Sequence, residues 1–182
     1  MALMESTMVP LGMACPDFTL PGVDGRLWSL HDFHTPALLV VVMCNHCPYV
    51  QAIDDRLNDL AKAYAGRCAV AGISANDAVN YPDDSFEAMR RRARVKGYTF
   101  PYLWDEEQIV VTQLGAVCTP DFFLYDSHRR LAYRGRLDDN WKDPAHVTRH
   151  DLQEALDGLL AGHEPMEGQQ PSMGCSIKWR PR

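Results

Sequence analysis

The sequence lacks any long apolar segment. Its longest apolar run covers residues 37–43, far below the ~18 residues that a membrane-spanning helix needs. The first ten residues contain an acid, Glu5, and no basic cluster followed by an apolar stretch, so no secretory signal is visible. We therefore expect a cytoplasmic protein that does not associate with a membrane.

Positive charge is also scarce. Lys and Arg total 18 against 24 Asp and Glu, a formal net charge of -6, so a general nucleic-acid binder is not expected. The 12 glycines and 12 prolines follow no period, which excludes a collagen-like or low-complexity chain. Hydrophobic residues make up 46% of the 182 residues, enough to bury a core, and this length predicts one main domain.

Cysteine is too sparse for a scaffold held together by disulfides. In a cytoplasmic protein of this length, a disulfide would be transient and catalytic rather than structural. The sequence has one CxxC motif, at residues 44–47, and neither a second CxxC nor the paired histidines that usually complete a structural zinc site. Its 6 cysteines are Cys15, Cys44, Cys47, Cys68, Cys118 and Cys175.

Hydrophobic patterning predicts a mixed α/β domain. Two alternating runs around residues 21–25 indicate an N-terminal β-hairpin, and the apolar run 37–43 is typical of a central strand buried on both faces. A helix is expected from Pro48 to the stop at Gly66. The other expected elements are a strand over 68–73, a helix over 84–96 with Asp84 and Glu87 as its capping box, a strand over 100–104, a helix over 106–114, a hairpin over 121–134 and a helix over 148–160.

This order divides the chain into three parts. An irregular lead-in, 1–16, precedes the domain, 17–160, and a Gly/Pro-rich tail, 161–182, follows it. The early strand–helix–strand unit predicts a parallel strand pair, and the late hairpin adds antiparallel strands, so the sheet is expected to be mixed. Ile177 and Trp179 give the tail apolar side chains with which to dock on the domain.

Cys44 and Cys47 stand where the buried strand ends and the helix that starts with Pro48 begins. A helix N-terminus offers unpaired N–H groups and partial positive charge, which stabilise a thiolate. A second thiol one turn away can then attack a mixed disulfide. A CxxC in this position indicates redox chemistry. Because Pro48 fixes the helix start just after Cys47, we expect Cys44 to be the more exposed thiol.

His46 lies inside the CxxC and has two interpretations. A protonated His46 would favour a thiolate on Cys44 and make the couple more oxidising than that of thioredoxin; otherwise it is a solvated loop residue. A metal site is the other interpretation of the motif, with His46, Cys118 or Cys175 completing a zinc-like ligand set.

A second motif, Cys118-Thr119-Pro120, directly precedes a predicted strand. Proline is tolerated at the first residue of a strand. Base rates alone favour a trans bond before Pro120.

Together these motifs resemble the thioredoxin fold in its peroxiredoxin-like branch, the AhpC/TSA or redoxin family. Residues 42–50, Val-Met-Cys-Asn-His-Cys-Pro-Tyr-Val, match the strand–CxxC–helix active site. Residues 117–121, Val-Cys-Thr-Pro-Asp, match the segment in which that fold carries a cis-proline in contact with the CxxC. The hairpin over 17–30 is similar to the N-terminal extension of redoxins. Residues 174–179, Gly-Cys-Ser-Ile-Lys-Trp, resemble the tail of a subgroup with an Asn-His-Cys-Pro active site. The resemblance implies a three-layer α/β/α sandwich with a mixed central sheet.

The resemblance also implies roles for individual residues. Cys44 would attack, Cys47 would resolve, and Pro120 would be the cis-proline. The backbone of Thr119 would pair with an incoming substrate strand. The supporting residues within the active-site loop are Asn45, His46 and Pro48. No cofactor is expected, because the cysteines carry both electrons.

The expected reaction is thiol–disulfide exchange. Typical peroxiredoxins have Pro and Thr or Ser seven and three residues before the peroxidatic cysteine; here these positions before Cys47 hold Val40 and Cys44. Reduction of hydroperoxides is the alternative within enzymes, and a metal-binding or redox-sensing module without turnover is the alternative of another class. Expected partners are a protein or small-molecule disulfide, or a peroxide, and a thiol donor such as a thioredoxin or glutathione system. A homodimer is left open.

The remaining cysteines receive different expectations. Cys68 lies on an apolar strand and is expected to be an inert core thiol. Cys15 is expected to be a surface thiol in a disordered lead-in. Cys175 is either a plain tail thiol or, if the tail docks near the active site, an extra exchanger with Cys44 or Cys118.

Overall fold

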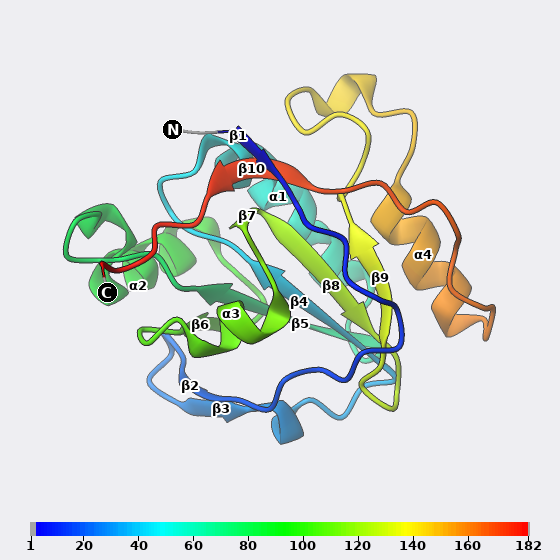
Figure 1. Cartoon of the computed structure of the whole chain (residues 1–182), viewed down its shortest axis with the longest axis horizontal. Helices are drawn as coiled ribbons and strands as arrows, with labels where there is room; N and C mark the ends of the chain where they lie inside the picture. Colours follow the sequence, from blue (N-terminus) through cyan, green and yellow to red (C-terminus); the bar gives the residue numbers. More distant parts are fainter. Residues whose placement is uncertain (1–2, 182) are drawn as a thin grey trace.

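A mixed five-stranded sheet forms the centre of the protein (Figure 1). The structure is a computed structural model and describes residues 3–181; residues 1–2 of the expected lead-in and residue 182 of the expected tail lie outside the described residues. In spatial order, the strands are β6 (Tyr102–Trp104), β5 (Cys68–Ser74), β4 (Ala37–Val42), β8 (Asp121–Tyr125) and β9 (Leu131–Gly135).

Strand directions follow from the connections. β4, β5 and β6 run parallel to one another, whereas β8 is antiparallel to both β4 and β9. Helices join the parallel strands, and a tight turn joins β8 to β9, as each pairing requires. The predicted mixed sheet is confirmed.

β4 is the structural centre because it contributes to two cores at once. Leu39 and Val41 point into a core shared with the helices α1 (Pro48–Ala63) and α4 (Asp151–Leu160). Leu38 and Val40 point into a second core on the opposite face. All six residues of the strand are buried, which explains why its sequence is continuously apolar rather than alternating.

The second core lies beneath the N-terminal hairpin and α3 (Ile109–Leu114). The hairpin pairs β2 (Thr19–Pro21) with β3 (Leu27–Ser29). With α1 and α4 on one face of the sheet and α3 on the other, the fold is a three-layer α/β/α sandwich, as expected (Figure 1). None of the helices within 3–181 is both long and apolar enough to cross a membrane.

Three helices begin later than the sequence predicts. α4 begins at Asp151 rather than near residue 148. α2 (Phe86–Lys96) is capped by Ser85, whose side chain accepts the backbone N–H of Ala88; Asp84 is therefore not its cap. α3 begins at Ile109 rather than near residue 106, because the carboxylate of Asp105 accepts the backbone N–H groups of its first turn.

The two ends of the chain meet in a second, three-stranded sheet. β1 (Leu3–Glu5) pairs with β10 (Met173–Ser176), which pairs in turn with β7 (Cys118–Thr119). The expectation that the lead-in is irregular is wrong for residues 3–5. Their short strand forms because the exposed edge of β10 is available for pairing, a partner 170 residues away that local sequence does not reveal.

A buried ion pair joins β8 to β9. Its acid, Asp121, follows β7 of the small sheet by two residues. Nη2 of Arg134 lies 2.9 Å from a carboxylate oxygen of Asp121, and neither side chain is exposed to solvent. The same guanidinium donates to the carbonyl of Gly115 and stacks over the ring of Phe123 at 4.5 Å. Burial raises the pKa of Asp121 to about 7, against the opposing effect of Arg134.

Replacing Asp121 by Asn is expected to destabilise the fold strongly. The change leaves the Arg134 charge buried without its partner, which costs about 3–5 kcal/mol of unfolding free energy. Urea denaturation above pH 7, where Asp121 is ionised, measures the loss. The double variant Asp121→Leu/Arg134→Met should recover much of it, because no charge is then left buried. A loss below about 1 kcal/mol for Asp121→Asn would contradict this assignment.

Candidate active site

The CxxC loop connects the most buried strand to the longest helix. β4 ends at Val42, and α1 begins at Pro48, so that Cys47 is the N-cap residue of the helix. Cys44 and Cys47 are 1% and 0% exposed. The expected difference in exposure between them is therefore wrong, because both thiols lie beneath other parts of the chain.

The Thr119–Pro120 segment lies directly against the two thiols. Cys44 Sγ is 3.4 Å from the hydroxyl of Thr119, and Cys47 Sγ is 3.1 Å from the carbonyl oxygen of Thr119. The Thr119–Pro120 bond is cis. The predicted cis bond and the predicted contact between these two segments, 72 residues apart in the sequence, are both confirmed.

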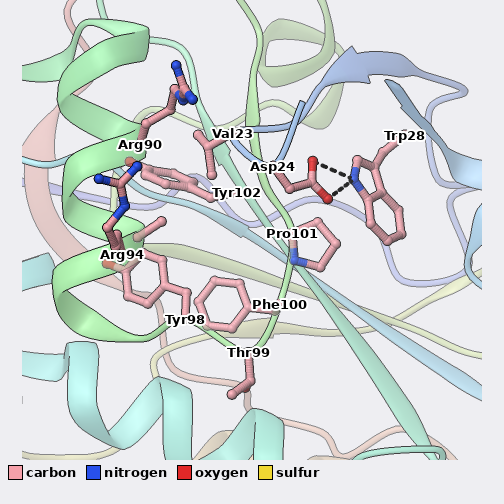
Figure 2. A pocket seen from close by; sticks show the side chains of 11 residues that line it. Val23, Asp24, Trp28, Arg90, Arg94, Tyr98, Thr99, Phe100, Pro101 and Tyr102 are labelled. Atoms are coloured by element: carbon pink, nitrogen blue, oxygen red, sulfur yellow. Dashed lines mark hydrogen bonds between the residues drawn. The ribbon is translucent and has the colours of Figure 1, made fainter. Parts of the chain in front are cut away.

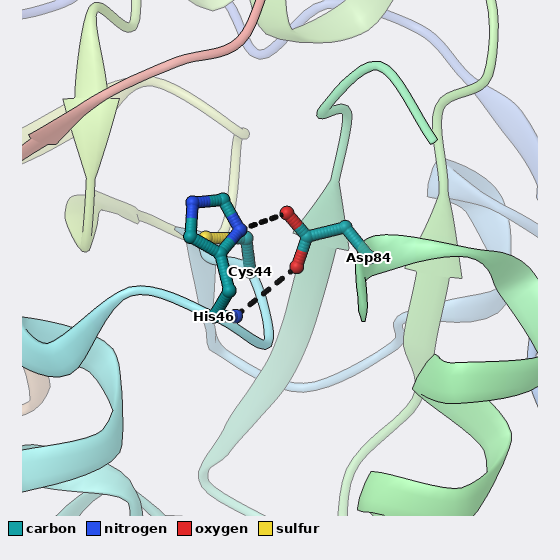
Figure 3. A group of neighbouring side chains, drawn as sticks. All are labelled: Cys44, His46 and Asp84. Carbon is teal, nitrogen blue, oxygen red and sulfur yellow. Dashed lines mark hydrogen bonds and ion pairs between the residues drawn. The ribbon is translucent and has the colours of Figure 1, made fainter. Parts of the chain in front are cut away.

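A buried carboxylate, Asp84, organises the loop and was missed by sequence reasoning. One oxygen accepts the backbone N–H groups of Asn45, at 2.7 Å, and His46, at 3.1 Å. The other accepts Nδ1 of His46 at 2.5 Å and the side-chain amide of Asn76 at 2.7 Å. Figure 3 shows the two bonds to His46. The sequence contained one signal for this role: Ser85 is as good a helix cap as Asp84. With Ser85 capping α2, the Asp84 carboxylate is available to bind the loop.

Asn45 fastens the other side of the loop. Its side-chain amide donates to the carbonyl of Asp83 at 2.7 Å, and its side-chain oxygen accepts the hydroxyl of Tyr102 at 3.1 Å. Gln51, one turn into α1, donates to the Asn45 carbonyl. These bonds hold the loop to three other elements, which fixes the positions of both cysteines.

The two thiols have opposite pKa shifts. Hydrogen bonding to Cys44 lowers the pKa of Cys47 to about 5; burial opposes this effect, while bonds from Cys175, Thr119 and the backbone N–H of Val50 add to it. The pKa of Cys44 is raised, because Cys44 keeps the shared proton, is buried and lies near the charge of Asp84. The expectation of a depressed pKa on Cys44 is wrong. Cys47 is the helix cap and therefore receives the stabilisation that a helix N-terminus offers.

His46 and Asp84 form an ion pair beside the thiols. The hydrogen bond with Asp84 raises the pKa of His46, and the negative charge of Cys47 contributes in the same direction. Burial pushes the pKa of Asp84 upward, but the bonds from His46 and Asn76 outweigh it and lower the value. His46 is thus a partly buried imidazole whose protonated form is favoured by Asp84, not a freely solvated loop residue. Its ring stacks on Tyr81 at 5.5 Å between centroids.

Three side chains at this site are close enough together to bind one metal ion. Within the described chain, the donor atoms of Cys44, His46 and Asp84 all lie within 4.8 Å of one another and form the one such cluster (Figure 3). Neither Cys118 nor Cys175 belongs to it, so the alternative in which these cysteines complete a zinc-like ligand set is not supported. A cation here would replace the hydrogen bond that joins His46 to Asp84.

The other four cysteines are all buried. Cys68 fits the expected inert core thiol, since burial raises its pKa to about 12. Cys15 is not a disordered surface thiol: it is 8% exposed, packs in the second core, and burial raises its pKa to about 12. Burial likewise raises the pKa of Cys118. Cys175 lies in β10, directly opposite Thr119, and so reaches the active site.

The two cavities described next are not lined by Cys44 or Cys47. A groove of about 450 Å³ lies between α2 and the hairpin, and its lining includes no cysteine. Figure 2 shows Arg90 and Arg94 on one side of it and the Asp24–Trp28 hydrogen bonds on the other. A smaller cavity of about 100 Å³ adjoins the cis-proline; Pro120, Trp141 and Ser172 are among its lining residues.

A family model described as AhpC/TSA matches residues 11–134, a span that contains both the CxxC and the cis-proline. The chain belongs to the AhpC/TSA family. No curated protein matches its sequence. Two solved structures share 42% sequence identity with it: a conserved protein from Geobacillus kaustophilus covers 100% of this chain and 98% of its own at a TM-score of 0.95, and a hypothetical protein from Sinorhizobium meliloti 1021 covers 98% and 99% at 0.93.

More distant structures share the fold. A peroxidoxin from Mycobacterium tuberculosis is 19% identical, covers 83% of this chain and 96% of its own, and has a TM-score of 0.60. A structure described as a putative thiol:disulfide interchange protein from Chlorobium tepidum is 18% identical and covers 84% and 99% at 0.68. The thioredoxin fold that the sequence predicts for this AhpC/TSA protein is confirmed.

The pKa of Cys47 leads to a direct titration experiment. Because its pKa is lowered from 9.0 to about 5, the thiolate is present at neutral pH and is lost only as the pH falls through 5. The ultraviolet absorbance of the thiolate in reduced protein should show this step. Cys68→Ser should keep the step, Cys47→Ser should remove it, and Cys44→Ala should move it to higher pH. A step that survives in Cys47→Ser would assign the thiolate to another residue.

Replacing Asp84 by Asn tests both its bonds to the loop backbone and its pairing with His46. The pKa of His46 should fall, because the bond that raises it is lost. Stability should drop by at least about 1–3 kcal/mol, since buried N–H donors lose a charged acceptor. Proton NMR of the imidazole and urea denaturation give the two values. Asp83→Asn is the matched control, because Asp83 is exposed and contributes only its backbone carbonyl. An unchanged His46 pKa would contradict the ion pair.

Proposed function

We propose that this AhpC/TSA protein is a thiol–disulfide oxidoreductase that works through Cys44 and Cys47. The observation that carries the proposal is the position of the pair: Cys47 is the N-cap residue of α1, Cys44 lies just before it, and both thiols lie against Thr119 of the cis-proline segment. The lowered pKa of Cys47 beside the raised pKa of Cys44 supports it. A nucleophile must be a thiolate, and a resolving thiol must stay close and protonated until it is needed.

The roles follow the pKa shifts rather than the order in the sequence. The Cys47 thiolate attacks one sulfur of a substrate disulfide; a Cys47–substrate bond forms, the substrate S–S bond breaks, and the second substrate sulfur leaves as a thiolate. Cys44 transfers its proton to that leaving group and attacks Cys47 Sγ. The Cys44–Cys47 disulfide forms, and the first substrate sulfur is released. The substrate gains two electrons and the protein loses two.

A thiol donor such as a thioredoxin or glutathione system then returns the protein to the dithiol. No organic cofactor enters this cycle, since the two sulfurs carry both electrons. His46, as a cation beside Cys47, helps to stabilise the thiolate that leaves each exchange step. Asp84 keeps His46 charged and is thus a positioning residue.

Hydroperoxide reduction is the second candidate. The same low pKa on Cys47 favours it, because a thiolate is also the species that attacks peroxides. In that reaction the Cys47 thiolate attacks one peroxide oxygen, the O–O bond breaks, and the other oxygen leaves as an alcohol or water. Cys47 becomes a sulfenic acid, and Cys44 condenses with it to give the same disulfide and one further water.

Parallel assays separate these two reactions. We expect reduction of insulin disulfides to fall by roughly a thousandfold or more in Cys47→Ser, to stop at mixed disulfides in Cys44→Ser, and to be unchanged in Cys68→Ser. Stopped-flow consumption of hydrogen peroxide is the comparison. Fast peroxide consumption without insulin reduction would establish the second candidate. Neither reaction, together with bound metal in protein purified without chelators, would favour a metal-binding module.

A further inference from the structure

The C-terminal tail fills the position beside the cis-proline where a substrate strand would bind. β10 pairs antiparallel with β7, with Cys175 opposite Thr119 and Ser176 opposite Cys118. β1 covers the outer edge of β10, where Leu3 lies opposite Cys175. Figure 1 shows β10 crossing the end of the central sheet between these two strands. The backbone of Thr119 is therefore already paired within the chain.

The tail is fixed on both sides of Cys175. Before it, the hydroxyl of Ser172 donates to the carbonyl of Pro120 at 2.6 Å. After it, the backbone N–H of Ile177 donates to the carbonyl of Val117 at 3.1 Å, and that of Lys178 donates to the side chain of Asn76 at 2.9 Å. These contacts determine the position of β10 along β7 and thus place Cys175.

Gly174 permits the close approach. A Cβ atom at this position would lie 1.9 Å from the carbonyl oxygen of Thr119, a distance that no side chain can adopt without moving the strand. Because the obstacle is backbone, the contact cannot be relieved by a rotamer change. Any larger residue at 174 is expected to push β10 away from Thr119 while leaving every thiol in the chain.

The Cys175 side chain then meets the reactive sulfur. It is 3% exposed and shares the core cluster that contains Cys44 and Cys47. Cys47 Sγ lies 3.1 Å from the carbonyl oxygen of Thr119, the residue that Cys175 faces across the strand pair. Hydrogen bonding to Cys44 has the largest effect in lowering the pKa of Cys47, and hydrogen bonding to Cys175 adds to it. Burial, followed by the bond with Cys47, raises the pKa of Cys175 to about 12.

We propose that β10 is an internal substrate strand, and that Cys175 exchanges with Cys47 to form a reversible Cys47–Cys175 disulfide that closes the site. The proposal rests on the function proposed above. It goes beyond it in assigning a third redox cysteine and in requiring β10 to leave Thr119 before an external protein strand can pair there.

The exchange balances with a low-molecular-weight disulfide as the oxidant. The Cys47 thiolate attacks glutathione disulfide, forming a Cys47–glutathione bond and releasing one glutathione thiolate. Cys175 transfers its proton to that thiolate and attacks Cys47 Sγ. The Cys47–Cys175 bond forms, the Cys47–glutathione bond breaks, and a second glutathione leaves. Two protein thiols are oxidised and one glutathione disulfide is reduced.

The test uses the full chain with Cys44→Ser, so that the CxxC disulfide cannot form. Reduced protein is equilibrated in glutathione buffers, quenched with acid and alkylated, and its disulfides are mapped by mass spectrometry. We expect a Cys47–Cys175 disulfide and two released glutathiones per chain. In Cys44→Ser/Cys175→Ser, oxidation should stop at a glutathione adduct on Cys47 with one released. Cys44→Ser/Cys68→Ser is the matched control and should behave like Cys44→Ser.

Gly174→Val separates the strand from the thiol. In the Cys44→Ser background it should lower the equilibrium constant for the Cys47–Cys175 disulfide by at least about tenfold, because the displaced strand reduces the effective concentration of Cys175. In the wild-type background it should speed alkylation of Cys47 by a bulky maleimide. An equilibrium constant and an alkylation rate that both equal those of the parent would show that β10 does not control access.

The two proposals fail in different ways. If Cys44→Ser stops at the glutathione adduct, as the double variant does, Cys175 is not a redox cysteine, and the exchange function of Cys47 stands. If Cys47 forms no adduct in any variant, the oxidoreductase function itself is wrong. A disulfide between Cys175 and Cys118 in place of Cys47 would also overturn the internal-substrate proposal.

Discussion

The position of Cys47 at the N-terminus of α1 is the constraint on which the rest of the site depends. Pro48 begins the helix, and the cysteine before it becomes the residue nearest to the unpaired N–H groups of the first turn. The thiol three residues earlier lies outside the helix and keeps its proton for the hydrogen bond to Cys47. Two chemically identical side chains thereby acquire opposite pKa shifts from a difference in backbone position.

This arrangement needs a rigid surrounding, which the sheet and Asp84 provide. β4 is buried on both faces, so the start of the loop cannot shift without disturbing two cores. Asp84 then fixes the loop itself by accepting backbone and side-chain donors from it. A carboxylate with four donors is stabilised in a buried position, and its charge in turn keeps His46 protonated beside the thiolate.

Closure by the tail gives the site a second property. Both cysteines of the CxxC are almost fully buried, although the exchange reaction requires contact with another molecule. β10 contributes to this burial, since it lies on β7 and places Cys175 in the core cluster that contains both cysteines. The resting protein thus resembles a complex with a bound strand, in which the strand belongs to the chain itself. In the proposal made above, movement of β10 away from Thr119 controls access to Cys47.

The sequence by itself determined much of the fold and the identity of the main site. The continuous apolar run of β4, the helix-starting Pro48 and the paired hairpins are local signals whose physical causes act over a few residues. With the CxxC and the Thr-Pro motif, they also predicted which two segments meet. The tertiary structure decided the rest: the contacts of Asp84, the burial of Cys15, the position of Cys175 opposite Thr119, and the pKa shifts of Cys44 and Cys47, which are opposite to those expected from the sequence. Each depends on groups that are distant in sequence, because burial and charge act through space and the local pattern contains no record of what packs against it.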